Sequence, residues 1–320
     1  MRSVLIDTDP GIDDAVAIMF ARRAGLDIKA LTAVSGNLQA DRAAANALRV
    51  LRLLDAESIP VARGTQTPLV RPYPRDPFSH GDDGLGNTGL AASSTPLDPR
   101  FAPDVIADVV NAAPGEITVL ALGPLTNLAL ALMRDPSLAT RIAHVYLIGG
   151  AFGRNRYAYT RATGDNPVSE WNVYVDPEAA QHVFQSGVPI TALGLDVVTH
   201  PDLDLRAEDR ERLATSDRPE AAFLLDIADY VRDMGFDSYC GLIDSMAVAA
   251  CLDPSVLTTQ KLHVTVETAG TATLGQTVVD EREHFRWDHL PLLNVAVSAD
   301  HNKILTMLVD ALTAEPGGAS

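Results

Sequence analysis

Cysteine, basic side chains and aromatic rings are all scarce in this sequence. Only two of its 320 residues are cysteine, Cys240 and Cys251, and their separation matches no zinc-site spacing. We expect both thiols to be reduced and to lie in or near the core. Lys and Arg number 25 against 42 Asp and Glu, which gives a net charge of −17. Because phosphate binding needs a basic surface, this charge argues against a nucleic-acid polymer as partner and leaves small neutral ligands open.

Long apolar runs are missing as well. No stretch reaches the roughly 20 residues that a membrane-spanning helix needs, so no membrane partner is expected. The first residues do not join a basic region to an apolar core, as a secretory signal would, which favours a cytoplasmic location. Pro, Gly and Ser are spread over short turns and form no linker. We therefore predict one domain over residues 1–313 and a flexible C-terminal tail over 314–320.

The sequence opens with an apolar strand that runs into an acidic turn. Val4–Ile6 has the composition of a buried strand, and residues 15–20 have the length and composition of a helix. Four aspartates occupy the turn: Asp7, Asp9, Asp13 and Asp14. They lie where a strand passes into a helix, which is where α/β proteins place their chemistry.

Four carboxylates this close repel one another unless positive charge lies among them. The helix N-terminus supplies part of it, through free N–H groups and the helix macrodipole. A hard cation would supply the rest, and oxygen ligands with no neighbouring His or Cys suit Ca²⁺ or Mg²⁺ better than zinc. The simpler alternative is an acidic N-cap with solvated neighbours, which accounts for one or two aspartates but not for four.

Strands and helices alternate along most of the chain. Further apolar segments that read as strands are 28–37, 59–62, 116–122, 144–150 and 189–196. This alternation predicts an α/β fold, a single-domain, doubly wound and largely parallel sheet with helices on both faces. The carboxyl ends of parallel strands share one edge, so the segments ending near these positions should meet there: Asp9, Asn37, Leu122, Gly149 and Asp196.

The turn also carries a family resemblance. Residues 7–14 read Asp-x-Asp-x-Gly-x-Asp-Asp, which resembles the signature of the nucleoside hydrolases, the inosine-uridine-preferring N-ribohydrolase family. Segments similar to this family recur almost to the C-terminus: His80–Gly86, Gly123–Asn127, Glu170–Asn172, Asp244 with the Ala-Val-Ala run after it, and 275–280. The haloacid-dehalogenase-type phosphatases also begin with a strand and Asp-x-Asp, and in them Asp7 would be the nucleophile and Asp9 the acid. The Asp13–Asp14 pair after the glycine favours the nucleoside hydrolases.

The resemblance implies Ca²⁺-dependent hydrolysis of the N-glycosidic bond of ribonucleosides, giving ribose and a free base for purine or pyrimidine salvage. The implied metal ligands are Asp9, Asp14, Asp244 and the main-chain carbonyl of Leu122. Asp9 would also accept the proton of the attacking water. The implied ribose contacts are Asp13, Asn37, Glu170 and Asn172, with His80 near the 5′ end. The resemblance further implies a homo-oligomer, a dimer or a tetramer.

Two of these residues also have simpler interpretations. Asn37 fits equally well as the cap of the next helix. A lone loop histidine such as His80 is more often an ordinary surface residue. Glu170 and Asn172 are two apart, so they point the same way if the segment is extended.

The chain departs from the family pattern at two places. Many members carry a histidine before the last metal aspartate that helps to protonate the leaving base, whereas this chain has Ile243. Tyr239 is the nearest alternative donor, although packing beside Phe236 is its simpler role. The family's loop asparagine falls on Gly164, so we expect Asn166 to take its place. These changes leave base preference open and keep a non-catalytic nucleoside binder as a third possibility beside the hydrolase and the phosphatase.

Overall fold

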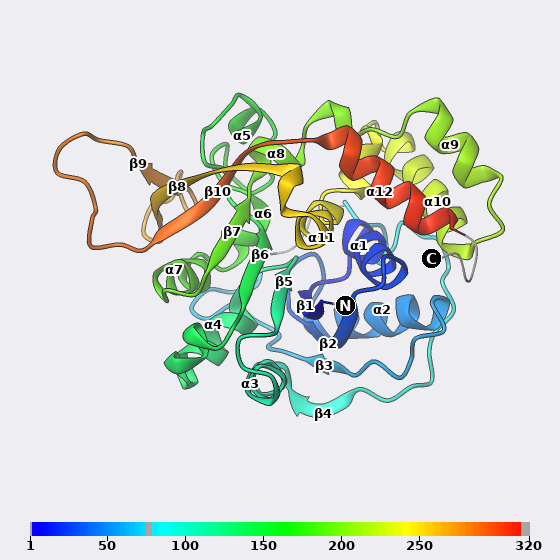
Figure 1. Cartoon of the computed structure of the whole chain (residues 1–320), viewed down its shortest axis with the longest axis horizontal. Coiled ribbons are helices and arrows are strands. Elements are labelled where there is room, and N and C mark those ends of the chain that lie inside the picture. Colours follow the sequence, from blue (N-terminus) through cyan, green and yellow to red (C-terminus); the bar gives the residue numbers. More distant parts are fainter. Residues whose placement is uncertain (1, 75–78, 315–320) are drawn as a thin grey trace.

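The computed structural model describes residues 2–74 and 79–314, and the strands within them form a single ten-stranded sheet (Figure 1). The strand order is β4-β3-β2-β1-β5-β6-β7-β10-β8-β9. The strands are β1 (Ser3–Thr8), β2 (Asp27–Ala33), β3 (Val61–Arg63), β4 (Asp98–Phe101), β5 (Thr118–Ala121), β6 (His144–Ile148), β7 (Ile190–Leu193), β8 (Leu257–Val266), β9 (Thr277–Asp280) and β10 (Leu292–Ala299).

The described helices alternate with the strands in the first part of the chain, whereas β8, β9 and β10 follow one another without a helix between them. They are α1 (Ile12–Arg23), α2 (Ala40–Leu53), α3 (Ala102–Ala112), α4 (Thr126–Arg134), α5 (Tyr157–Thr160), α6 (Trp171–Val175), α7 (Pro177–Gln185), α8 (Leu195–Val198), α9 (Ala207–Ala214), α10 (Pro219–Asp233), α11 (Ser245–Leu252) and α12 (His301–Thr313). A short 3-10 helix, η3 (Ser238–Gly241), precedes α11.

The strand order places the switch in chain direction at β1. The chain runs outward from β1 through β2 and β3 to β4, then returns to place β5 on the other side of β1. Both neighbours pair with β1 in parallel. In open α/β sheets, ligands bind at the carboxyl edge beside such a switch point. Asp9 follows β1 and Leu122 follows β5, so both lie at that edge.

The sheet is buried between two hydrophobic cores. On β1, Val4 and Ile6 pack into one core and Leu5 into the other, as the two-residue period of a strand requires. Helices α1, α11 and α12 contribute to the first core, whereas α3, α4 and α7 contribute to the second, and Figure 1 shows these groups on opposite sides of the sheet. The predicted fold class is therefore confirmed.

Four predicted strands end earlier than expected, two of them by three residues or more. The segment 28–37 is a strand only to Ala33, so Asn37 lies in the loop beyond it. The segment 189–196 is a strand only to Leu193, and Asp196 lies in α8. Its carboxylate accepts hydrogen bonds from the backbone N–H groups of Phe152 and Arg154, so Asp196 shapes the loop after β6.

Both cysteines are free thiols, with Cys251 buried and Cys240 half-buried, as predicted. Within 2–74 and 79–314, no helix is long and apolar enough to cross a membrane. The last described helix, α12, ends at Thr313, and residues 315–320 of the predicted tail lie outside the described residues.

Candidate active site

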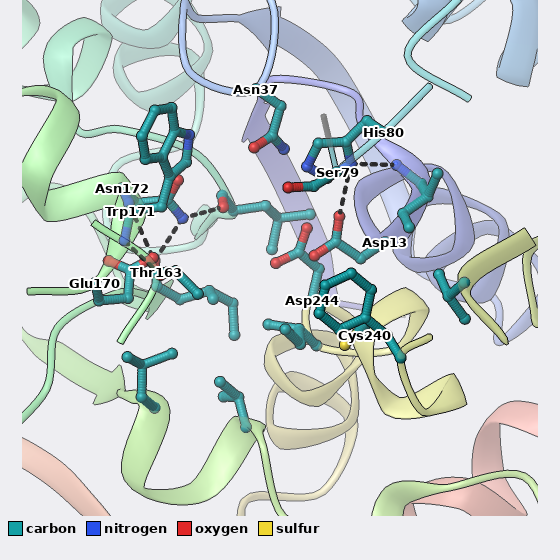
Figure 2. Close-up of a pocket in the computed structure, with 18 of the residues that line it drawn as sticks. Asp13, Asn37, Ser79, His80, Thr163, Glu170, Trp171, Asn172, Cys240 and Asp244 are labelled. Atoms are coloured by element: carbon teal, nitrogen blue, oxygen red, sulfur yellow. Dashed lines mark hydrogen bonds and ion pairs between the residues drawn. The ribbon is translucent and has the colours of Figure 1, made fainter. Parts of the chain in front are cut away.

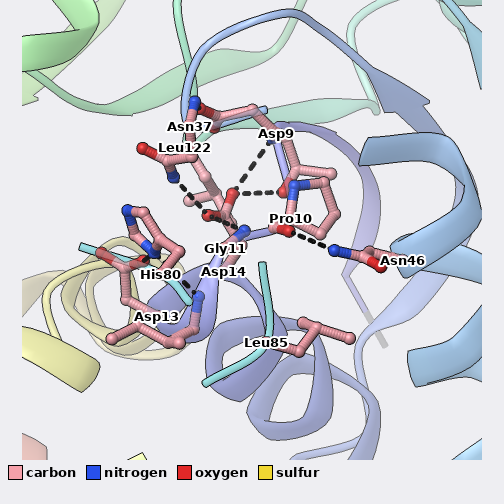
Figure 3. A network of polar contacts seen from close by, with 12 residues as sticks. Asp9, Pro10, Gly11, Asp13, Asp14, Asn37, Asn46, His80, Leu85 and Leu122 are labelled. Carbon is pink, nitrogen blue, oxygen red and sulfur yellow. Dashed lines mark hydrogen bonds and ion pairs between the residues drawn. The ribbon is translucent and has the colours of Figure 1, made fainter. Parts of the chain in front are cut away.

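Asp14 is the structural centre of the acidic turn (Figure 3). Its Oδ1 accepts hydrogen bonds from Thr8 Oγ1 at 2.5 Å and from the Asp9 N–H at 3.2 Å. Its Oδ2 accepts from the Gly11 N–H at 3.0 Å and from Asn37 Nδ2 at 3.2 Å. Asp14 also occupies the third position of α1, where the helix N-terminus favours a carboxylate. These contacts hold Asp14 as the anion that closes the turn.

Asp9 is fully buried and has one oxygen to spare. Its Oδ2 accepts from the Asn37 N–H at 2.6 Å, but its Oδ1 accepts no hydrogen bond. A Cβ atom on Gly123 would lie 2.3 Å from this Oδ1, and one on Gly36 would lie 2.0 Å from Oδ2, so both positions need glycine to make room. Burial raises the pKa of Asp9 well above its usual value, and the negative charge of Asp14 adds to this.

Asp244 brings a third segment of the chain to the same point. Oxygens of Asp13, Asp14 and Asp244 all lie within 4.8 Å of one another, and all three side chains are buried. Burial raises the pKa of Asp244, and the charges of Asp13, Asp14, Asp9 and Glu170 raise it further. Every charge in that set is negative. A cluster of this kind is destabilised unless a cation or protons neutralise it.

A cavity of about 410 Å³ opens beside the aspartates (Figure 2). Its polar lining includes five of the predicted substrate contacts and one predicted metal ligand: Asp13, Asn37, His80, Glu170, Asn172 and Asp244. Leu122, whose carbonyl is the predicted fourth metal ligand, also lines the cavity. Asp9 and Asp14 lie deeper, each with 0% of its surface exposed.

Glu170 and Asn172 lie at the start of a helix, so the condition under which they would point the same way, an extended segment, is not met. Glu170 is the N-cap of α6, and its carboxylate accepts from the backbone N–H groups of Gly150, Asn172 and Val173. Burial nevertheless raises the pKa of Glu170 to about 7. The amide of Asn172 donates to the Leu122 carbonyl at 2.7 Å, which fixes that carbonyl at the cavity wall.

His80 lies against the start of α1. Its Nδ1 accepts a hydrogen bond from the Ile12 N–H at 3.2 Å and lies 4.0 Å from Asp13 Oδ1. An Nδ1 that accepts leaves the proton of a neutral imidazole on Nε2. Behind this contact, the buried Asn46 of α2 donates to the carbonyls of Pro10 and Asp83, which ties the acidic turn to the loop that carries His80 (Figure 3).

Two predicted substrate contacts do not reach the cavity. Asn166 donates to the Leu274 carbonyl and accepts from Ser169 Oγ, so its amide holds the loop together and Thr163 lines the cavity instead. Tyr239 is outside the lining too, with its ring 4.4 Å from the guanidinium carbon of Arg161. Burial raises the pKa of the Tyr239 hydroxyl, which makes it a weaker acid.

Sequence reasoning missed most of the apolar side of the cavity. We define the apolar wall as Ala162, Leu195, Val198, Val231, Met234, Phe236 and Ile243. Of these, only Ile243 was identified from the sequence. The helical spacing of Val231 and Met234 was the one available signal, and it equally fits an ordinary core face. Ser79, Trp171 and Cys240 also line the cavity.

Comparisons with known proteins agree along the whole chain. A family model described as inosine-uridine preferring nucleoside hydrolase matches residues 4–306. The pyrimidine-specific ribonucleoside hydrolase RihA of Citrobacter koseri is 37% identical over 315 residues, which cover 97% of each chain. RihA of Shigella boydii is 35% identical over 321 residues, again with 97% of each chain covered.

Solved structures give the same result. The plant nucleoside hydrolase PpNRh1 has a TM-score of 0.86 at 36% identity, covering 98% of this chain and 99% of that chain. A purine-preferring ribonucleoside hydrolase from Gardnerella vaginalis also has a TM-score of 0.86, at 28% identity and with 98% of both chains covered. The fold and the site thus define an enzyme that hydrolyses N-glycosidic bonds of ribonucleosides.

The chain belongs to the inosine-uridine preferring nucleoside hydrolase family. This membership replaces the phosphatase and non-catalytic alternatives. Asp7 Oδ1 accepts hydrogen bonds from Thr32 of β2 and from Asn127 of α4. Asp7 thus joins the end of β1 to these two elements.

Proposed function

We propose that this enzyme is a Ca²⁺-dependent ribonucleoside hydrolase that releases ribose and a free base. The observation that carries the proposal is the meeting of Asp13, Asp14 and Asp244 in one buried cluster, at a cavity lined by amides and carboxylates. A nucleoside has a polyhydroxylated end and a flat, largely apolar end. The cavity offers both kinds of surface, with carboxylates and amides for hydroxyl groups and the apolar wall for a base.

The donor set fits a hard cation. Carboxylate and carbonyl oxygens are the ligands that Ca²⁺ prefers, and Asp9, Asp14, Asp244 and the Leu122 carbonyl would hold it. The buried Asp9 Oδ1 without a hydrogen-bond partner supports this, because such an oxygen is costly unless a ligand satisfies it. When bound, the cation would neutralise the cluster and polarise a water molecule for attack on the sugar.

The side chains then divide the remaining work. Asp9 accepts a proton from the attacking water. Asp13, Asn37 and Asn172 bind ribose hydroxyls, and their oxygens favour the positive charge that grows on the sugar as the bond to the base breaks. The apolar wall holds the base and keeps water away from it.

A turnover screen tests the proposal directly. Uridine, cytidine, inosine, adenosine and nicotinamide riboside are incubated with the enzyme in Ca²⁺, and free ribose is measured as reducing sugar. The pyrimidine specificity in the names of the RihA relatives makes uridine and cytidine the first substrates to test. Ribose release from at least one nucleoside is expected. Nucleoside binding without ribose release, or phosphate release from p-nitrophenyl phosphate instead, would refute the proposal.

A cytoplasmic salvage role and a homo-oligomeric state remain predictions. Light scattering coupled to gel filtration would give the mass in solution, to be compared with the 34.1 kDa of one chain.

A further inference from the structure

The apolar wall is built from four separate parts of the chain that need to be held together. Ala162 follows α5, Leu195 and Val198 belong to α8, Val231 and Met234 lie at the end of α10, and Phe236 and Ile243 flank η3. Apart from α10, these segments are short. A wall of this kind keeps one shape only if something fixes its parts to one another.

Arg161 lies where three of these parts meet. Its guanidinium carbon is 4.4 Å from the centre of the Tyr239 ring in η3 and 5.0 Å from the centre of the Tyr157 ring in α5. Its Nη1 donates to the carbonyl of Thr199, the residue that follows α8. One half-buried side chain therefore contacts three of the four segments.

The contacts continue to the cavity lining. Cys240, the residue that follows Tyr239 in η3, lines the cavity. The backbone N–H of Tyr239 donates to Asp204 Oδ1 at 2.9 Å, and the charge of Arg161 also acts on Asp204. The Tyr157 ring also packs edge-on against the His200 ring, with the two ring centres 5.4 Å apart.

We propose that Arg161 is a positioning residue that fixes the apolar wall and thereby sets the affinity for the base of the substrate. This inference rests on the proposed function, since it assigns the base to the apolar wall. A guanidinium stacked on aromatic faces stabilises their relative placement, and its planar fork adds a directional hydrogen bond that an ammonium group would not reproduce. Arg161 acts only through the wall, so ribose binding at the aspartates should not depend on it.

The test uses the two halves of a nucleoside as separate probes. Dissociation constants for uracil, hypoxanthine and D-ribose are measured by NMR titration of the full-length chain in Ca²⁺. In Arg161→Gln we expect base affinity to fall about tenfold and ribose affinity to change less than about twofold. Arg161→Lys should recover part of the base affinity, because it keeps the cation but not the planar fork.

Arg156→Gln is the matched control. Its guanidinium also lies 5.0 Å from the Tyr157 ring, but from an exposed position, so its loss should leave both affinities unchanged. Tyr239→Leu removes the ring instead of the cation and should show the same selective loss of base affinity. If the melting temperature shows that Arg161→Gln does not fold, Tyr239→Leu tests the inference in its place.

The outcomes separate this inference from the proposed function. Neither probe is hydrolysed, so the titrations do not depend on turnover. If folded Arg161→Gln and Tyr239→Leu bind bases as the wild type does, or lose ribose equally, the inference is wrong. If the wild type binds both probes and the selective loss is seen, but no nucleoside yields ribose, the proposed function fails and the inference stands.

Discussion

At the scale of single residues, Asp9 and Asp14 share a turn but have different surroundings. Asp14 accepts four hydrogen bonds, two of them from backbone N–H groups of the turn itself. Asp9 accepts one and keeps Oδ1 unbonded in a fully buried place. The four hydrogen bonds fix the position of the Asp14 carboxylate, whereas the unbonded oxygen of Asp9 is suited to take a proton.

Asp9→Asn should therefore fold like the wild type but lose most of its catalytic activity. The amide oxygen can still accept from the Asn37 N–H, but the residue can no longer take a proton. We expect kcat for ribose release to fall by about 10²–10⁴-fold, the usual contribution of positioned proton transfer, with ribose affinity nearly unchanged. Asp41→Asn, at an exposed position on α2, is the control and should behave as the wild type. A kcat close to wild type in Asp9→Asn would place the base elsewhere.

Ile243 cannot donate a proton to the leaving base, although it occupies the position where many family members have a histidine. It lines the cavity next to Asp244, whereas Tyr239 is outside the lining and its hydroxyl is weakened as an acid by burial. We expect the wild type to prefer p-nitrophenyl riboside, whose leaving group needs no proton, over inosine. Ile243→His should raise kcat/KM for inosine relative to p-nitrophenyl riboside. If inosine is cleaved as fast as the activated substrate and the substitution leaves the ratio unchanged, protonation comes from another group.

The site was predictable from sequence where side chains lie on a rigid turn and less so where they lie on loops. Residues 7–14 are fixed by one strand, one glycine and one helix start, so the spacing of the aspartates was enough to predict that they lie close together. Asn166 lies outside the cavity lining because hydrogen bonds to Leu274 and Ser169, which are set by the path of the loop, use its amide. Cys240 and Met234 were missed because a cavity wall and a core face have the same composition.

At the scale of elements, the predicted strands agree with the structure for β1 to β3 and β5 to β7, whereas the parallel strand β4 and the later strands β8 and β10 were not predicted. The six predicted strands are mostly buried and read as apolar runs. Strand β8 runs antiparallel to β10, and residues 258–261 in it are exposed and include Thr258, Thr259, Gln260 and Lys261. A half-exposed strand of this kind carries no apolar run, so its sequence resembles a loop.

His301 gives the contact between α12 and α8 a pH dependence. It is buried, its Nε2 lies 2.7 Å from the Val197 carbonyl, and its ring stacks on His200 at 4.5 Å. Burial lowers the pKa of His301 below its usual 6.5. Above that pH both folded and unfolded chains hold the neutral ring; as the pH falls through about 6.5, the unfolded chain takes up the proton first and stability is lost.

Urea unfolding at pH 8, 7, 6 and 5 measures this effect. The midpoint should fall more steeply below about pH 6.5 in the wild type than in His301→Gln, whose amide can still donate to Val197. His289→Gln, at an exposed histidine, should retain the wild-type slope. Equal slopes in wild type and His301→Gln would show that this ring does not set the acid stability.

At the scale of the whole molecule, negative charge is unevenly placed. The chain carries a net charge of −17. Several of its buried carboxylates lie together at the carboxyl edge of β1. A surface charge of this size is shielded by water and salt, whereas buried carboxylates are not. The stability of the fold is therefore coupled to whatever neutralises Asp9, Asp13, Asp14 and Asp244.

This coupling predicts a crossing of stabilities between wild type and Asp244→Asn. After chelation the variant should melt at the higher temperature, because it has one repelling carboxylate fewer in the cluster. With Ca²⁺ restored the wild type should gain about 2.7 kcal/mol when free Ca²⁺ is about 100 times its Kd, and the variant much less, because a ligand that binds only the folded state stabilises it by mass action. Melting curves of both proteins with chelator and with Ca²⁺ test this. Parallel shifts in the two proteins, or no shift in either together with no calcium by metal analysis, would show that the aspartates hold no Ca²⁺ and that protons neutralise them.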